Sequence, residues 1–421
     1  MRALGIWSVA VVVYIAAVFH RTSLGVAGLE AAQRFHVGPA ALGTFTVLQI
    51  GLYALMQVPT GLLVDHWGPR RVLTVAAVLL GLGQLLFAVA ASYPLGLLAR
   101  AVLSIGDAMT FVSVLRLVAG HFPAHRYAAL AAVTAALGTV GNLVATVPLT
   151  VLLDSAGWTL TFAVAGAATV VYAVVVALRL PGAPTARQPI ALGGAVADVA
   201  RSWRIPGTRL GFWVHFSTMF APAVLGLLWG FPYLVQAQGL SDGAAGSVLG
   251  VLVIGALVGS PTLGMLIGRR PEWRMPLVGG YLVGALAVWA VLLGWPGRIP
   301  LVALVVAFAG LSLGGPASTI AFALARDYNP MHRVGTATGV VNVGGFVAIT
   351  VAALAVGLLL DLTGSFRIAL LAVVALLGLG FWRTAVWWRR ARAAVFAAEA
   401  RGEDVPVRLT HRRWDAAVVP A

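Results

Sequence analysis

The sequence contains no cysteine and no lysine, and only 10% of its 421 residues are charged. Without cysteine, the chain can form neither a disulfide nor a thiolate that would bind a metal or attack a substrate. Hydrophobic residues make up 60% of the chain, so the charged residues are too sparse to cover the surface of a water-soluble protein of this size. The composition therefore indicates a membrane protein.

Patterns typical of enzymes are also missing. We find no nucleophile elbow, no residues with metal-ligand spacing and no glycine-rich loop that would hold a phosphate. We therefore expect a protein that is not an enzyme and that needs neither a cofactor nor a metal. The net charge of +15 would suit a nucleic-acid partner. Arginine gathered in the loops on one side of a membrane explains it better, so we expect no nucleic acid.

Repeated apolar runs of about 20 residues have the length that a helix needs to cross a bilayer. We predict an all-α membrane protein with twelve spans, at 4–27, 40–64, 71–91, 95–119, 127–153, 158–178, 208–236, 243–267, 275–294, 300–324, 335–360 and 365–388. The first span lacks a small-residue cleavage site, so we expect it to be retained. Pro222 and Pro232 predict a break in the seventh span, and the glycines and proline of 310–316 predict one in the tenth.

The arginines predict the orientation of these spans. One set of loops is rich in arginine, whereas the opposite set holds only Arg34, Arg298 and Arg367. The arginine-rich side should face the cytoplasm, and with twelve spans both termini should lie there too, in a multi-pass protein of the plasma or inner membrane. We expect four parts: a six-helix bundle at 1–179, a cytoplasmic linker with a short surface helix at 180–207, a second bundle at 208–388 and a solvated tail at 389–421.

One segment of the sequence occurs twice. Phe-Pro-Ala-His-Arg at 122–126 and Asn-Pro-Met-His-Arg at 329–333 each lead into an apolar, glycine-bearing run. The two copies align at a single offset of about half the chain in the pairs Pro123/Pro330, His125/His332, Arg126/Arg333, Gly138/Gly345, Asp154/Asp361 and Gly157/Gly364. Duplicated halves in so apolar a chain predict two pseudo-symmetric bundles, as in a transporter that rocks one half against the other.

Residues 61–71, GLLVDHWGPRR, lie between the second and third spans and combine Gly61, Asp65, Gly68, Arg70 and Arg71. This loop resembles the signature loop of the major facilitator superfamily, with histidine at 66 where the family usually has arginine or lysine. The resemblance implies two six-helix bundles in the major facilitator fold. The aspartate of such a turn can face a helix N-terminus or a nearby arginine and hold one conformational state.

The counterpart of this loop in the second half is GMLIGRR at 264–270, where Gly268 replaces the aspartate. We therefore expect the conformational latch, meaning the contact that holds one state, only in the first half. Arg116 should lie near the cytoplasmic mouth, where it could contact Asp65. We favour a structural role for Arg116 over a substrate role.

Two shorter motifs narrow the resemblance. Residues 19–27 resemble the first-helix motif of the anion:cation symporter family, with Arg21 at the family's arginine and His20 at its aspartate. Residues 100–108 resemble its fourth-helix motif, with Arg100 at the arginine and Asp107 at the glutamate. In that family these positions carry anion binding and proton coupling. The resemblance implies the same roles here, with Arg21 binding substrate and Asp107, Arg100 and His20 coupling protons.

The chemistry of these residues agrees with that assignment. A charge inside a bilayer is costly, so each one is a functional candidate. Arg21 offers a planar fork suited to a carboxylate, and Asp107 is a carboxyl near the middle of the membrane where it could load and release a proton. Arg100 lies seven residues before Asp107, on nearly the same helix face. It could exchange protons and substrate with Asp107, or form a permanent ion pair that joins the first and fourth spans.

Uncharged polar residues at membrane depth need partners or water, and some could contact substrate. The candidates for substrate binding are Gln49 and Tyr53 in the second span, Asn142 in the fifth, His215 in the seventh and Asn342 in the eleventh. Each could instead be a hydrogen bond between helices, as could Gln57. We expect a monomer whose partners are a small-molecule substrate, protons and the lipid bilayer.

Several functions remain open at this point. From the motifs above we favour a proton-coupled importer of a small organic anion over a proton-driven drug exporter, because residues 138–144 lack the glycine- and proline-rich run of such exporters. Transport of nitrate ranks lower, because those carriers usually pair one arginine in each half. A sensor that does not transport is disfavoured by the short linker.

Overall fold

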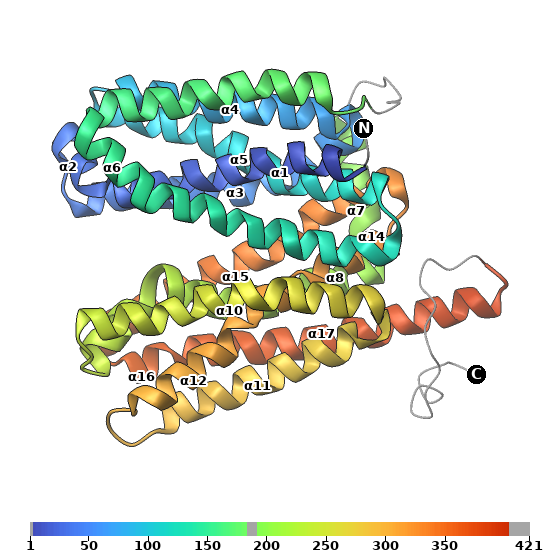
Figure 1. The fold of residues 1–421 in the computed structure, drawn as a ribbon. Coiled ribbons are helices and arrows are strands. Elements are labelled where there is room, and N and C mark those ends of the chain that lie inside the picture. Colours follow the sequence, from blue (N-terminus) through green and yellow to red (C-terminus); the bar gives the residue numbers. More distant parts are fainter. Residues whose placement is uncertain (1–2, 183–191, 404–421) are drawn as a thin grey trace. The chain divides into compact units, whose positions relative to one another are not determined.

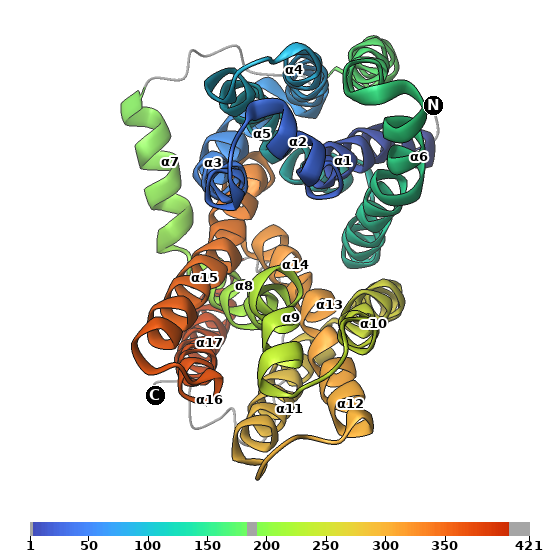
Figure 2. The ribbon, with the colours of Figure 1, turned by 90° about the vertical axis from the view of Figure 1, so that its left-hand side faces the viewer.

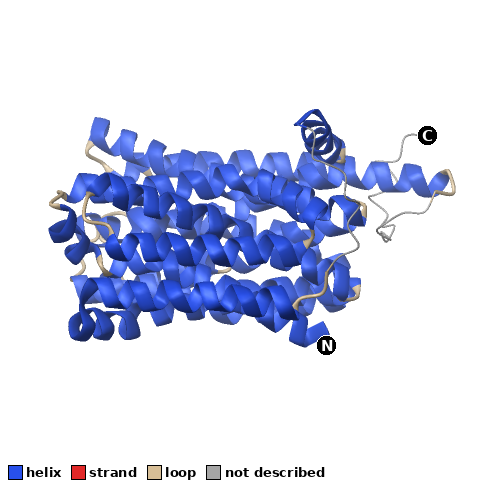
Figure 3. Cartoon of the chain, turned by 90° about the horizontal axis from the view of Figure 1, so that it is seen from above, coloured by secondary structure: helices blue, strands red, loops and turns tan. Residues whose placement is uncertain are grey.

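The computed structural model describes residues 3–182 and 192–403, and this part of the chain is built from helices without a strand (Figure 3). Twelve of the helical segments are long and apolar enough to cross a membrane. Each of them overlaps one of the twelve predicted spans, which confirms the all-α membrane fold. The agreement is expected, because inside a bilayer a helix satisfies all its backbone hydrogen bonds within one segment.

The chain divides into two compact units, which are described separately. Unit 1 comprises Met1–Phe122, Thr134–Ala200 and Met331–Gly339, and unit 2 comprises Pro123–Val133, Arg201–Pro330 and Val340–Ala421. Each unit thus includes a short segment from the other half of the sequence. These two segments, 123–133 and 331–339, begin at the repeated Pro-x-His-Arg motif.

The first half of the chain supplies six spans to the fold (Figure 1). Its helices are α1 (Ala3–Val26), α2 (Gly28–Phe35), α3 (Pro39–Trp67), α4 (Pro69–Val89), α5 (Tyr93–His121) and α6 (Ala124–Arg179). The last of these contains two spans that meet at Gly157, where a φ of 71° interrupts the helix and favours glycine. The eight-residue α2 lies between the first two predicted spans, in a stretch that we expected to be a loop.

Helix α5 is the most buried of the twelve spans, and its sequence explains why neighbours approach it closely. A Cβ atom built on Gly106 would lie 2.8 Å from the Ala76 carbonyl oxygen of α4, and one built on Gly83 of α4 would lie 2.6 Å from the Leu103 nitrogen. Only glycine fits at both positions. The charged residues of α5 are therefore held deep inside the bundle.

The second half of the chain supplies the other six spans (Figure 2). Its main helices are α8 (Pro206–Val224), α10 (Asp242–Arg269), α11 (Arg274–Gly294), α12 (Leu301–Ser312), α13 (Gly314–Ser318), α14 (Ile320–Tyr328), α15 (Val334–Thr363), α16 (Phe366–Ala369) and α17 (Leu371–Ala400). Short turns complete it: π-helical turns at Leu225–Trp229 and Tyr233–Ala237 flank α9 (Gly230–Pro232), and 3-10 turns occupy Pro271–Trp273 and Met331–Arg333.

The predicted breaks in the seventh and tenth spans are present. After α8 the seventh span passes through two π-helical turns around α9, close to Pro222 and Pro232. The tenth span is divided into α12, α13 and α14 around the glycines and proline of 310–316. Proline removes a backbone donor and glycine tolerates altered dihedral angles, so both breaks follow from local sequence.

The linker between the two halves and the segment after the last predicted span both contain helix. The linker contains the predicted short helix, α7 (Leu192–Arg204), while residues 183–191 lie outside the described residues. Helix α17 continues to Ala400, twelve residues past the expected end of the last span (Figure 1). Val395 and Phe396 are buried there, so the stretch 389–400 is a packed helix rather than a solvated tail. Residues 404–421 of the expected tail lie outside the described part.

Candidate functional site

A bidentate ion pair joins α1 to α5 inside unit 1. Arg21 donates from Nε to Oδ2 of Asp107 and from Nη2 to Oδ1, each over 2.7 Å. Asp107 is fully buried, whereas the Arg21 side chain is 32% exposed. The planar guanidinium fork matches the two carboxylate oxygens, which is the strongest geometry for such a pair. Arg21 is therefore the accessible partner of a buried carboxylate.

Arg100 does not form the expected contact with Asp107 in the described structure. It is fully buried and donates from Nη1 to the His20 carbonyl oxygen over 2.9 Å and from Nη2 to the Arg21 carbonyl oxygen over 3.1 Å. Nη2 also contacts Oε1 of Gln49. Although Arg100 shares a helix face with Asp107, its fork is thus occupied by the backbone of α1. Arg100 positions the segment that carries Arg21.

Two residues of α3 complete the surroundings of Arg21. The Arg21 guanidinium lies 4.7 Å from the centre of the Tyr53 ring, a cation–π contact that leaves the arginine charged. Gln49 accepts from Arg100, and its Nε2 lies 3.4 Å from the Arg21 carbonyl oxygen. The structure therefore brings Arg21, Gln49, Tyr53, Arg100 and Asp107 into one cluster, drawn from α1, α3 and α5.

His20 is buried beside this cluster, and its hydrogen bonds define its tautomer. Its Nε2 lies 2.8 Å from Oγ1 of Thr169, whose own hydrogen is donated to the Ala165 carbonyl oxygen. Thr169 must therefore accept, so Nε2 of His20 carries the proton and Nδ1 is the bare nitrogen. Nδ1 has no partner. The His20 side chain is not bonded to Arg21 or Asp107 in the described structure, and its role in proton coupling stays a prediction.

The other predicted polar residues lie apart from this cluster. Asn142 of α6 is exposed and accepts a 2.6 Å hydrogen bond from Thr22 of α1. In unit 2, His215 and Asn342 are buried and interact with each other, and Nδ1 of His215 lies 3.4 Å from the Ser318 carbonyl oxygen. These contacts join helices within each unit. Any substrate contact at these three residues remains a prediction.

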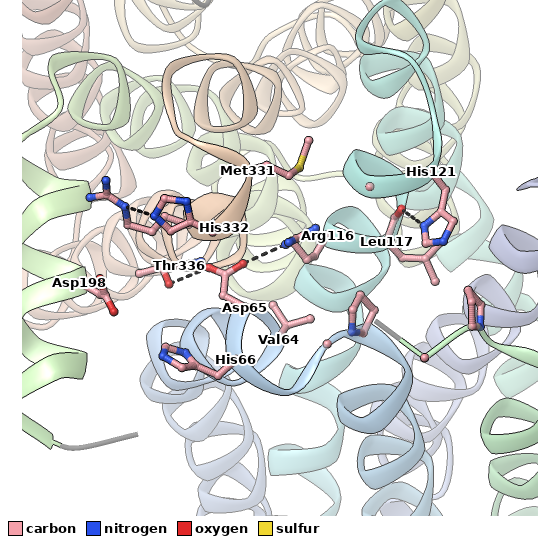
Figure 4. Close-up of a pocket in the computed structure, with 16 residues that line it drawn as sticks. Val64, Asp65, His66, Arg116, Leu117, His121, Asp198, Met331, His332 and Thr336 are labelled. Carbon is pink, nitrogen blue, oxygen red and sulfur yellow. Dashed lines mark hydrogen bonds and ion pairs between the residues drawn. The ribbon is translucent and has the colours of Figure 1, made fainter. Parts of the chain in front are cut away.

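A second polar centre in unit 1 surrounds Asp65 at the end of α3 (Figure 4). Arg116 donates from Nε to Oδ1 over 2.9 Å, as the sequence led us to expect. The backbone nitrogens of Gly335 and Thr336 donate over 2.9 and 2.7 Å, and the Thr336 hydroxyl donates over 2.9 Å. Asp65 therefore caps the N-terminus of α15, where the helix dipole favours a negative charge.

Two glycines make this contact possible. A Cβ atom on Gly61 would lie 2.5 Å from the Gly335 carbonyl oxygen, and one on Gly335 would lie 2.7 Å from Oδ1 of Asp65. Gly68 has a φ of 80° and ends α3 immediately before α4 begins. Beside the contact is a pocket of about 670 Å³, lined also by His66, His121 and His332 (Figure 4).

Arg70 and Arg71 are not part of the Asp65 contact in the described residues. Arg71 is exposed, and Arg70 is half-buried near Gly182. Arginines that follow the turn are therefore not the partners of its aspartate here. Arg116 and the start of α15 take that place. Any latch role for Arg70 and Arg71 stays a prediction.

The matching loop in unit 2 has the close approach without the charge. A Cβ atom on Gly264 would lie 2.5 Å from Cβ of Ala132, and one on Gly268 would lie 2.6 Å from the His125 carbonyl oxygen. These positions correspond to Gly61 and Asp65 in the first half. The repeat therefore extends to the packing of the loops, and only the first copy carries a carboxylate.

Three partners of these centres are not among the predicted residues: Gly335 and Thr336, which bind Asp65, and Thr169, which binds His20. The first two follow the second copy of the Pro-x-His-Arg motif closely, which was the available signal. No local signal pointed to Thr169, because an isolated threonine is common in membrane helices.

A sequence profile described as "Major Facilitator Superfamily" matches residues 10–353 and 231–417. The chain belongs to this superfamily. It is therefore a multi-pass membrane transporter and not an enzyme. The match agrees with the twelve spans, the repeated halves and the signature loop around Asp65.

Curated relatives and solved structures support the same assignment. The chain is 26% identical to a probable sulfoacetate transporter, SauU of Cupriavidus necator, over 80% of this chain and 84% of the relative. It is 27% identical to a probable galactarate/D-glucarate transporter, GarP of Escherichia coli, over 84% of this chain and 87% of GarP. Its fold is similar to that of the E. coli fucose:proton symporter FucP, with a TM-score of 0.68 and 16% identity over 92% and 99% of the two chains. For the proton:xylose symporter XylE the TM-score is 0.70 and the sequence identity 14%, and the match covers 92% of this chain and 96% of XylE.

Proposed function

We propose that this transporter carries a small organic anion with a carboxylate group, by proton-coupled symport with alternating access. The observation that carries the proposal is the Arg21–Asp107 pair, in which a buried carboxylate is bound by a partly accessible arginine fork. A substrate carboxylate and Asp107 offer the same two oxygens. They can therefore compete for the same guanidinium.

The charges of the cluster favour an anion. Arg21 and Arg100 carry two positive charges and Asp107 one negative charge, so the cluster has a net charge of +1 when Asp107 is ionised. Protonation of Asp107 would raise this to +2 and leave the Arg21 fork without its partner. A buried charge needs compensation, and an anionic substrate supplies it.

This competition supplies a route for coupling. Binding of the substrate carboxylate to Arg21 releases Asp107, which then takes a proton because a buried carboxylate without a partner is unstable as an anion. Release of the proton restores the Arg21–Asp107 pair and expels the substrate. Arg100, held by α1 and Gln49, keeps Arg21 in place throughout. In this scheme Arg21 rather than Arg100 exchanges proton and substrate.

The curated relatives support an organic anion over the alternatives. SauU is described as a probable transporter of sulfoacetate, and GarP as one of galactarate and D-glucarate, which are organic acids. A drug exporter that binds cations would meet a cluster of net positive charge. We place the transporter in the cell membrane with both termini in the cytoplasm, as the distribution of arginine indicates.

We further propose that Asp65 holds one conformational state by capping α15. Its carboxylate has four hydrogen-bond donors, from Arg116, Gly335 and Thr336. Charge-assisted bonds of this kind are about twice as strong as neutral ones. The adjoining pocket lets water reach the carboxylate when the contact opens. The latch would then break and re-form in each transport cycle.

The substrate class is tested by thermal stabilisation of the purified protein with carboxylates, sugar acids, nitrate and cationic drugs at acidic and neutral pH. A ligand that prefers the folded state raises the apparent melting temperature. We expect a carboxylate to stabilise the wild-type protein and to lose this effect in Arg21→Ala. The control is Arg34→Ala, which should keep the effect, because Arg34 binds the carbonyl oxygens of Ala88 and Ala90 in the described structure. Stabilisation by a cationic drug that survives Arg21→Ala would contradict the proposal.

A further inference from the structure

Three arginines surround a single tryptophan in unit 2. The guanidinium carbons of Arg209, Arg383 and Arg390 lie 4.7, 5.9 and 4.7 Å from the centre of the Trp387 ring. Arg209 comes from the start of α8, and the other three residues come from the middle of α17. We call these four residues the arginine–tryptophan cluster. It lies outside the two centres described above.

Further tryptophans enlarge the aromatic part of this surface. Arg209 also lies 5.4 Å from the ring of Trp203 and donates from Nε to the Trp203 carbonyl oxygen over 2.7 Å. Arg383 lies 5.1 Å from the ring of Trp213 and 5.5 Å from that of Trp382. Cation–π contacts hold guanidinium groups in place but leave their positive charge intact.

The cluster has no anionic partner within the described residues. Neither Arg209, Arg383 nor Arg390 forms an ion pair there, and Nε of Arg383 is buried without any hydrogen-bond partner. Other arginines of unit 2 behave differently, since Arg274 and Arg326 both bind Asp327. Three like charges around one ring repel each other, and a bound anion would remove that cost.

The position of the cluster favours a lipid as the source of this anion. Arg209 lies close to the start of the seventh span, and Arg390 lies two residues past position 388, where the sequence predicts that the last span leaves the membrane. Trp382, on the same helix, is 58% exposed. Tryptophan is enriched where membrane helices meet the headgroup layer, and basic side chains at that level attract anionic headgroups. Arg383, one turn deeper than Trp387, can reach that layer with its long side chain.

We propose that the arginine–tryptophan cluster binds the phosphate of an anionic phospholipid, with its acyl chains beside the exposed face of α17. Arg390, which is exposed, and Arg383 would contact the phosphate from α17, and Arg209 from α8. A lipid bound here would join α8 to α17 within unit 2. The inference does not depend on the identity of the transported substrate.

The test counts lipids bound to the full-length protein by native mass spectrometry. The probe is phosphatidylglycerol added to detergent-solubilised protein, with phosphatidylcholine as the neutral comparison. The test variant is Arg383→Gln/Arg390→Gln. The matched control is Arg269→Gln/Arg270→Gln, which removes the same charge from two exposed arginines of unit 2. Each arginine near anionic lipid is worth about fivefold in affinity.

We expect phosphatidylglycerol to bind wild type and the control equally. It should bind the test variant about 25-fold more weakly, since two arginines are removed at about fivefold each. Arg390→Gln alone, at an exposed position, should weaken binding about fivefold and guards against a folding defect in the double variant. Equal loss in test variant and control would overturn the proposal, because it would show a diffuse effect of charge. Binding of inorganic phosphate or glycerol phosphate with the same arginine dependence would also overturn it, in favour of a soluble phosphate ligand.

Discussion

Arg21 binds both carboxylate oxygens of Asp107, each over 2.7 Å, across 86 residues of sequence. The pair connects the first helix to α5, the most buried of the twelve spans in the described part of the chain. It leaves Asp107 fully covered and Arg21 partly accessible. This asymmetry underlies our account, in which substrate replaces Asp107 on Arg21 and a proton replaces Arg21 on Asp107.

The first prediction concerns the shape of the Arg21 side chain. Lysine keeps the charge but cannot make two parallel hydrogen bonds to a carboxylate. We expect Arg21→Lys to weaken substrate binding by about thirtyfold or more, equivalent to about 2 kcal/mol for a disrupted charged contact. Binding can be measured by calorimetry on the purified protein. Unchanged affinity would show that the fork geometry of Arg21 is unimportant for the substrate.

The second prediction concerns the support of Arg100. Gln49→Leu removes an acceptor from the fully buried Arg100 guanidinium. An unsatisfied buried donor costs about 1–3 kcal/mol, so we expect a lower melting temperature and weaker substrate binding. Gln33→Leu, at an exposed position, is the control and should shift stability by less than about 0.5 kcal/mol. Equal melting temperatures for both variants would show that Gln49 does not support Arg100.

The third prediction concerns the Asp65 contact and uses the absence of native cysteine. Thr338 is fully buried, so Thr338→Cys should react slowly with a water-soluble thiol reagent. Asp65→Asn removes the charge that binds Arg116 and caps α15, and we expect it to speed labelling several-fold and to slow transport. Loss of one charge at a helix N-terminus costs about 0.3–2 kcal/mol.

A control for this experiment is Asp154→Asn in the Thr338→Cys background. Asp154 is exposed and distant in sequence from the Asp65 loop. Its replacement should leave the labelling rate unchanged. Labelling that is equally slow with and without the Asp65 carboxylate would contradict the latch.

The helices could be predicted from the sequence because their causes are local. Apolar runs long enough to cross a bilayer predicted the twelve spans, and prolines and glycines predicted the breaks in the seventh and tenth spans. The continuation of α17 to Ala400 was missed because charged residues after Arg389 suggested a solvated tail. The overlooked helical signal was the alanine-rich run 391–400, because alanine has the highest helix propensity.

The candidate residues were predictable, but their pairing was only partly so. Arg116 was expected near Asp65 and lies there. Helical periodicity places Arg100 and Asp107 on nearly the same face of α5. It carries no information on how α1 packs against α5. The pairing of Arg21 with Asp107, and of Arg100 with the α1 backbone, therefore needed the three-dimensional structure.

The most direct test of the coupling mechanism is uptake by Asp107→Asn in proteoliposomes, with an imposed pH gradient and a carboxylate substrate identified by thermal stabilisation. Asparagine is similar in size but cannot carry the transported proton. We predict that Asp107→Asn loses uphill, proton-driven accumulation while retaining exchange of labelled for unlabelled substrate. Full uphill accumulation by Asp107→Asn would contradict the account.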